Sequence, residues 1–221
     1  MTLDLTALEL RILGALIEKQ ITTPEYYPLT LNALVAACNQ KNNRNPVMQL
    51  TADEVARALA TLQYDRQLVG TYSSAGSRAV KYTHRLTETI GVDSPEGAIL
   101  CELMLRGPQT PGELRGRAAR MHPFASPAEV KIALDSLMAR QPDPYVAELP
   151  RQPGCKENRF AHCFGDTPIQ DPGAPPDSAP PPPGPAATDT PPQDETRLQA
   201  LEERIARLEA RLEAWAERAS G

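Results

Sequence analysis

The sequence has no apolar run that approaches the roughly 20 residues a helix needs to cross a bilayer. Its N-terminus also lacks the basic and then apolar layout of a secretory signal peptide. We therefore expect a soluble, cytoplasmic protein with no membrane partner. Cysteines are few, and they suggest no secreted disulfide framework. Two of them, Cys38 and Cys101, fall within expected helices and are predicted to fill the core.

The sequence signatures of common enzyme classes are missing as well. There is no glycine-rich phosphate loop, no nucleophile elbow and no His-Glu-x-x-His pair. Seven residues separate Cys155 from Cys163, whereas structural zinc sites use more closely spaced cysteine pairs. His84 and His122 stand alone, and packing or solvation accounts for them. We expect a non-enzymatic protein with no metal and no cofactor.

An excess of positive charge is also absent. Residues 1–90 carry a formal charge of +1, residues 91–166 carry −1 and residues 167–221 carry −5. A strongly basic domain is the usual electrostatic sign of a DNA-binding protein. The charge balance therefore gives no support to DNA binding.

What the sequence does contain is an internal repeat. Residues 51–62 and 126–137 share the pattern Ser/Thr-x-x-Glu-Val-x-x-Ala-Leu-x-x-Leu. The first half of this pattern is a helix capping box, and the second half places apolar residues on one helix face. The copies start 75 residues apart, which exceeds the roughly 20–50 residues of a solenoid repeat. They indicate two small domains of one fold.

The segments around the two copies also correspond. In each half, an amphipathic helix and then a short helix precede the repeated helix. The amphipathic helix follows Thr6 in the first half and Ser94-Pro95 in the second. The short helix follows Thr30 in the first half and Thr110 in the second. After each repeated helix, two β-rich segments flank a turn, at 68–72 with 79–82 and at 145–149 with 159–162.

Three helices followed by a β hairpin form the winged-helix version of the helix-turn-helix. We therefore predict a mainly α fold with small β wings. One winged-helix domain is expected in residues 1–90 and a second in residues 91–166.

The composition changes after residue 166. Proline supplies 11 of the 28 residues in 167–194, and almost nothing in this segment is apolar. Such a segment cannot offset its ordering entropy, so it predicts an extended, disordered linker. The alternative is that its proline run docks an SH3-like domain.

Residues 195–221 are predicted to form a coiled-coil helix that joins copies of the chain. Their apolar residues alternate at spacings of three and four, which is an a/d heptad seam. The residues of the seam are Leu198, Leu201, Ile205, Leu208, Leu212 and Trp215. Arg at the g positions and Glu at the e positions favour parallel strands. A dimer and a trimer both fit, and the alternative is a frayed amphipathic tail.

Four segments carry a family resemblance: Leu5-Thr6-Ala7-Leu8-Glu9, residues 18–25, residues 38–48 with Cys-Asn-Gln-Lys at their start, and residues 105–115. They resemble the YceH family, a group of bacterial proteins without an assigned biochemical activity. The resemblance covers about residues 3–165. It implies tandem winged-helix domains and a C-terminal helix, and it implies no catalytic residues.

The densest polar segment, residues 39–45, precedes the third helix. It joins cations with amides that donate and accept hydrogen bonds, which suits phosphates or base edges. The alternative is a solvated connector, since Asn favours turns. Arg57 on the third helix and two basic residues of the wing extend this candidate site. Its residues are Asn39, Lys41, Asn42, Asn43, Arg44, Arg57, Arg78 and Lys81.

A second basic cluster, Arg115, Arg117 and Arg120, is interpreted as the exposed face of a helix. Two functions therefore remain open. The first is a DNA-associated transcriptional regulator, and the alternative is a protein-interaction adaptor that does not bind nucleic acid. A continuous positive stripe through Lys41, Arg44, Arg57, Arg78 and Lys81 would favour DNA, and scattered charge would favour the adaptor.

Overall fold

The computed structural model describes residues 3–73, 79–151, 153–154 and 156–165. These residues belong to one compact unit, Met1–Pro175. The predicted linker and the predicted coiled-coil helix, including its six seam residues, lie outside the described residues, as do Arg78 and Cys155. Within the described residues, no helix is both long enough and apolar enough to cross a membrane.

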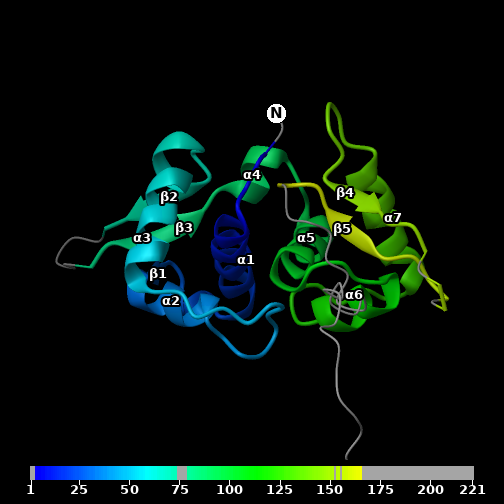
Figure 1. Ribbon diagram of the computed structural model, residues 1–221, viewed down its shortest axis with the longest axis horizontal. Coiled ribbons are helices and arrows are strands. Elements are labelled where there is room, and N and C mark those ends of the chain that lie inside the picture. The colour runs from blue at the N-terminus through cyan, green and yellow to red at the C-terminus, as the bar shows by residue number, and fades with distance from the viewer. Residues whose placement is uncertain (1–2, 74–78, 152, 155, 166–221) are drawn as a thin grey trace, which may run out of the picture. The chain divides into compact units, whose positions relative to one another are not determined.

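The first half of this unit is mainly helical, with short strands between and after the helices (Figure 1). Its elements are α1 (Ala7–Thr22), η1 (Pro24–Tyr26), β1 (Leu29–Thr30), α2 (Leu31–Cys38), α3 (Ala52–Ala60), η2 (Thr61–Asp65), β2 (Val69–Tyr72) and β3 (Lys81–His84). The short helix α4 (Leu86–Ile90) leads into the second half.

The second half repeats this order with fewer elements. They are α5 (Ser94–Arg106), α6 (Pro111–Ala118), α7 (Pro127–Met138), β4 (Val146–Glu148) and β5 (Phe160–His162). The coarse prediction of helices combined with small antiparallel sheets is thereby confirmed.

Both sheets are antiparallel and short. In the first half β3 lies between β1 and β2, with Tyr82 opposite both Leu29 and Thr71. In the second half β4 pairs with β5, and Gln109 forms an isolated bridge with Phe160. The sequence patterns predicted the hairpins but neither β1 nor the Gln109 bridge, because two residues are too few to show an alternating pattern.

The predicted helix starts are confirmed for α1, α3 and α6, each of which has a complete capping box. Two details differ from the prediction. Helix α5 begins at Ser94 itself, because Asp93 is its N-cap. In α7, Ser126 caps the Glu129 amide, but the Glu129 carboxylate accepts from the Ala125 N–H at 2.7 Å, so the second copy has only half of a capping box.

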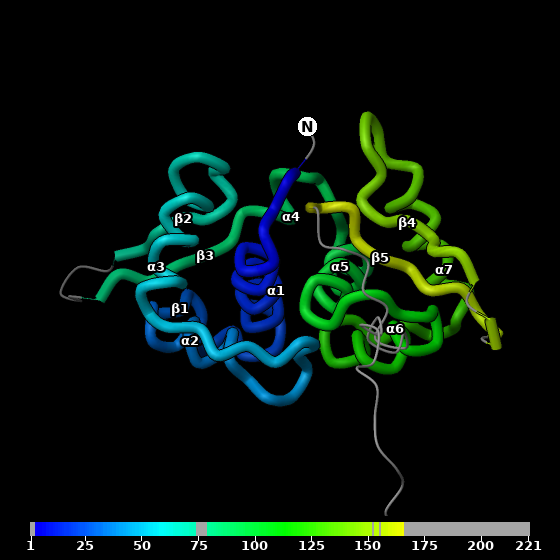
Figure 2. The backbone as a smooth tube through the Cα atoms, viewed as in Figure 1, coloured from blue at the N-terminus to red at the C-terminus, as the bar shows by residue number. Residues whose placement is uncertain are grey.

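Helices α1 and α5 lie side by side in the middle of the described unit (Figure 2). They come closest at Gly14, where an added Cβ would lie 2.9 Å from the Leu105 side chain. The Cys101 thiol also donates to the Gly14 carbonyl at 3.3 Å. The buried residues of both halves consequently form one continuous core. The expected domain boundary at residue 90 stays a prediction.

The two ends of the described unit also meet. The Leu5 N–H donates to the Phe164 carbonyl at 2.9 Å. At Gly165 a Cβ would lie 2.1 Å from the Leu5 carbonyl oxygen, so this contact requires glycine. Leu3 and Leu5 are buried on the N-terminal side of the contact, and Phe164 on the other.

Candidate functional site

The polar segment singled out in the sequence belongs to the loop between α2 and α3, residues 39–50. This 39–50 loop is closed at its base, where Asn39 exchanges two hydrogen bonds of 2.8 Å with the backbone of Leu50. At its far side the Asn45 N–H donates to the Leu105 carbonyl at 2.9 Å. The loop therefore rests on the C-terminal end of α5, in the second half of the chain.

Arg44 points from this loop into the core, where 5% of the residue is exposed. Its Nη2 lies 2.6 Å from the Glu18 carboxylate, and its Nε donates to the Ala37 carbonyl at 3.1 Å. These contacts occupy the guanidinium. Arg44 therefore has no free face for a phosphate, contrary to its place in the predicted binding site.

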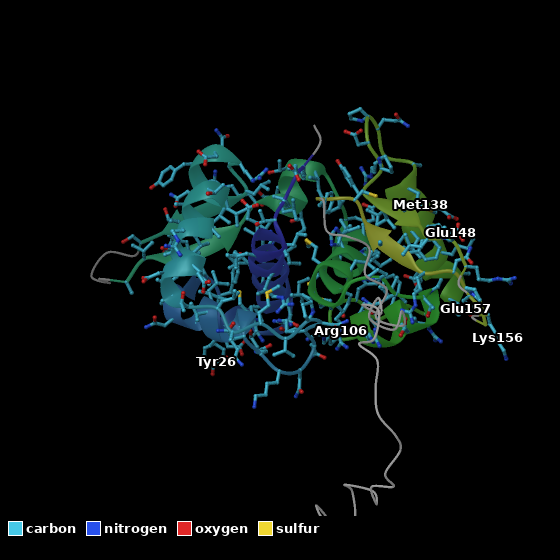
Figure 3. The ribbon with its side chains drawn as sticks, viewed as in Figure 1. Tyr26, Arg106, Met138, Glu148, Lys156 and Glu157 are labelled. Atoms are coloured by element: carbon cyan, nitrogen blue, oxygen red, sulfur yellow. The ribbon has the colours of Figure 1, made fainter. Side chains whose placement is uncertain are left out.

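Glu18 is at the centre of a buried ionic network that spans both halves. The Arg120 guanidinium lies 2.6 Å from Glu18 and 2.8 Å from Glu102. Arg106 lies 3.1 Å from Glu102 and also donates to the side-chain oxygen of Asn43. Figure 3 shows Arg106 between the 39–50 loop and the helices of the second half.

Helix ends help to balance the charge of this network. Arg11 is 1% exposed, and its guanidinium donates to the Cys38 carbonyl at 3.1 Å, at the C-terminal end of α2. Arg44 donates to the same helix end through Ala37. Each helix C-terminus carries the equivalent of about half a negative charge, so these carbonyls supplement the carboxylates of Glu18 and Glu102.

The network also shifts protonation equilibria. Burial raises the pKa of Glu18, but the hydrogen bond and charge of Arg44, followed by the charge of Arg120, outweigh it, so the net pKa is lowered. Burial and the neighbouring charge of Arg44 lower the pKa of Arg11 to about 10. Both groups therefore remain charged at neutral pH, as a buried ion network requires.

The outward face of α3 differs from this buried network. Asp53, Arg57 and Ala60 are exposed, and Tyr64, in the following π-helical turn η2, is 72% exposed. Arg57 is the sole Lys or Arg in residues 52–65. The face thus combines small and aromatic side chains with one cation and one carboxylate.

The neighbouring hairpin and the second half show a similar mixture. In the hairpin, Tyr72 and Val80 are exposed, and Lys81 is half-buried beside them. On α7, Ile132 is 69% exposed, and its neighbour Lys131 pairs with Asp135 at 3.2 Å. Neither third helix therefore presents a row of cations.

The structure separates the residues predicted to form one binding site. Lys41 and Asn42 are exposed on the 39–50 loop, and Arg57 is exposed on α3. Asn39 and Asn43 hold the loop in place, and Arg44 lies inside the core. The predicted stripe of five cations is therefore interrupted at Arg44.

The second basic cluster is interpreted from the sequence as the exposed face of a helix; Arg120 is exposed but lies beyond that helix. Helix α6 ends at Ala118, and the guanidinium of Arg120 reaches the buried carboxylates of Glu18 and Glu102. Arg115 donates to the carbonyls of Phe124 and Ala125, and Arg117 pairs with Glu113 at 3.2 Å.

The sequence patterns also missed Glu18 and Glu102. Glu102 lies inside an apolar helical run, next to Cys101, and Glu18 directly follows one that ends at Ile17. A carboxylate at such a position needs a buried partner. That rule would have identified the acidic half of the network, although not the arginines that complete it.

The isolated histidines and cysteines serve packing. Cys38 and Cys101 are fully buried, as predicted, and burial raises the pKa of both thiols. His84 is buried against Gln20, and burial lowers its pKa to about 4. His122 lies 3.3 Å from Glu129. In the described part of the chain, no group of three His, Cys, Asp or Glu residues could hold a metal ion.

Comparisons with known proteins find relatives over most of the chain. The model of a protein family described as "protein of unknown function, DUF480" matches residues 5–155. A UPF0502 protein of Geotalea uraniireducens is 54% identical over 168 residues, covering 76% of this chain and 75% of that protein. A UPF0502 protein of Geotalea daltonii is 46% identical over 211 residues, covering 95% and 88% respectively. The predicted resemblance to an uncharacterised bacterial family is thereby confirmed.

Proposed function

We propose that this chain, which belongs to the DUF480 family, is a non-enzymatic tandem winged-helix protein that binds another protein through α3. The element order supports the winged-helix assignment, since each half has three helices followed by a hairpin. In both halves a short third β pairing precedes the second helix, at Leu29–Thr30 and at Gln109.

The composition of the outward face of α3 is the observation that favours a protein partner. Tyrosine is enriched in protein interfaces, and charged residues are depleted from their centres. Tyr64 is 72% exposed beside exposed Ala60, and Arg57 is the sole Lys or Arg of residues 52–65. This composition suits a protein surface better than a phosphate backbone.

The burial of two arginines and the ion pairing of two others strengthen the argument against nucleic acid. Residues 1–166 contain 18 Lys and Arg and 18 Asp and Glu in total. Arg11 and Arg44 are buried, and Arg106 and Arg120 pair with Glu18 or Glu102. The network therefore takes up four cations and two anions, which leaves the rest of this region net acidic.

DNA-associated regulation is the second candidate, and the exposure of Arg57 and Lys41 favours it. If DNA is the ligand, removing one cation that binds a phosphate should lower the slope of log affinity against log salt by about one unit. Arg57→Ala and Lys41→Ala should then weaken binding equally across sequences.

A photo-crosslinking amino acid placed at Tyr64 tests the proposal, with Tyr26 as the matched control. Tyr26 is 71% exposed but lies on η1 rather than on α3. We expect a discrete protein adduct from position 64 in cells that is absent from position 26. No adduct from position 64, together with salt-dependent binding of duplex DNA that Arg57→Ala weakens, would favour the second candidate.

We also propose that residues 195–221 join copies of the chain as a parallel coiled coil, with residues 167–194 as the linker. The heptad spacing from Leu198 to Trp215 supports this assembly. Two α3 faces on one flexible assembly would raise the effective concentration for a two-site partner.

A further inference from the structure

We propose that the 39–50 loop is a strap through which the second half of the chain controls the order of α3. The proposal does not depend on what α3 binds. It follows from two features of the loop: its middle, at Asn45, rests on α5, and its end, Leu50, directly precedes Thr51, the N-cap of α3.

The attachment to the second half is polar and specific. The Asn45 N–H donates to the Leu105 carbonyl at 2.9 Å, and its side chain donates to the Arg106 carbonyl at 3.4 Å. The Arg106 guanidinium returns a hydrogen bond to Asn43. Asn43 has a φ of 60°, a left-handed conformation that this contact helps to hold.

A second attachment runs through the core. Arg44 anchors the middle of the loop to Glu18, and Glu18 is shared with Arg120 of the second half at 2.6 Å. Arg120 also lies 2.8 Å from Glu102 on α5. Loss of Arg120 therefore leaves buried carboxylate oxygens with fewer partners, and the effect reaches the loop through Glu18 and Arg44.

The start of α3 is held by its own capping box and by the loop that precedes it. Thr51, Ala52 and Asp53 are exposed, and the first buried residue of the helix is Val55. The bonds between Asn39 and Leu50 fix the residue directly before the N-cap. When the loop opens, the first turn of α3 loses the neighbour that positions it.

Hydrogen exchange measured by mass spectrometry on the full chain tests the strap. In Arg106→Gln and in Arg120→Gln, backbone amides of residues 43–55 should exchange about tenfold faster or more, and those of α7 should not change. Arg117→Gln is the matched control, because Arg117 also belongs to a second-half ion pair but pairs with Glu113 rather than with the loop. It should leave residues 43–55 unchanged.

A second pair of variants distinguishes loss of the loop contact from a general loss of stability. Asn43→Gly keeps the left-handed backbone but removes the acceptor of Arg106, whereas Asn42→Gly makes the same change at the exposed neighbour. Only Asn43→Gly should speed exchange in residues 45–55. Unchanged exchange there in Asn43→Gly and both arginine variants would overturn the proposal, as would an equal increase in α3 and α7.

Discussion

Gly14 sets how closely α1 and α5 approach, and Gly14→Ala tests that contact. The added Cβ would lie 2.9 Å from Cγ and Cδ2 of Leu105 and 3.5 Å from Cβ of Met104. Carbon atoms in good contact are about 3.5–4.0 Å apart, so the Leu105 side chain or the helices must move by several tenths of an ångström.

Two opposing effects determine how much Gly14→Ala changes the free energy of unfolding. Overpacking a core costs roughly 1–3 kcal/mol, whereas replacing Gly by Ala inside a helix contributes about 1 kcal/mol of stability. We therefore expect Gly14→Ala to lower the free energy of unfolding by up to about 2 kcal/mol, measured by urea denaturation followed by circular dichroism.

Removing the Leu105 side chain should turn the effect of Gly14→Ala from destabilising to stabilising. Leu105→Ala alone should cost about 2–5 kcal/mol, because Leu105 is fully buried. In that background Gly14→Ala should stabilise the protein by about 1 kcal/mol, since only the helix preference remains. Gly116→Ala is the control: nothing lies within 4 Å of its Cβ, so it should stabilise in both backgrounds. The same sign for Gly14→Ala in both backgrounds would refute the packing argument.

Three further predictions concern other parts of the chain. Burial holds the pKa of His84 at about 4, below its ordinary 6.5. The free energy of unfolding should therefore fall as the pH drops from 6.5 to 4, because only the unfolded chain takes up the proton, and denaturation of His84→Gln should show a smaller slope. Thr6→Ala should cost about 1 kcal/mol in thermal unfolding by removing the N-cap of α1, whereas Thr6→Ser should be nearly neutral. In sedimentation, the full-length chain should be oligomeric and a chain ending at Asp166 monomeric; equal monomeric masses would exclude the coiled coil.

The helices and hairpins could be predicted because their signals are local. A cap such as Thr51 and its partner Glu54 are three residues apart, and apolar spacing reports one helix face. The half-formed box at Ser126 shows the limit of this logic. There the Glu129 carboxylate accepts a hydrogen bond from the Ala125 N–H instead of from Ser126, and the pattern alone does not reveal this.

The buried network could not be predicted in the same way, because its partners are distant in the sequence. Arg44 is 26 residues from Glu18, and Arg120 comes from the other half of the chain. Sequence patterns grouped both arginines with exposed cations, since Arg44 lies in a polar segment and Arg120 in a basic cluster. Only the tertiary fold shows which arginines meet Glu18 and Glu102.

The two halves share one core, so the first half cannot complete its packing until the second half has been synthesised. Glu18 is made about 100 residues before Arg120, which at roughly 5–20 residues per second is a delay of about 5–20 seconds. During that time the side of α1 that faces α5 has no cover, and Leu5 has no Phe164 to bond. The first half must therefore wait on the ribosome with an apolar face of α1 exposed and with Glu18 paired to Arg44 but not to Arg120.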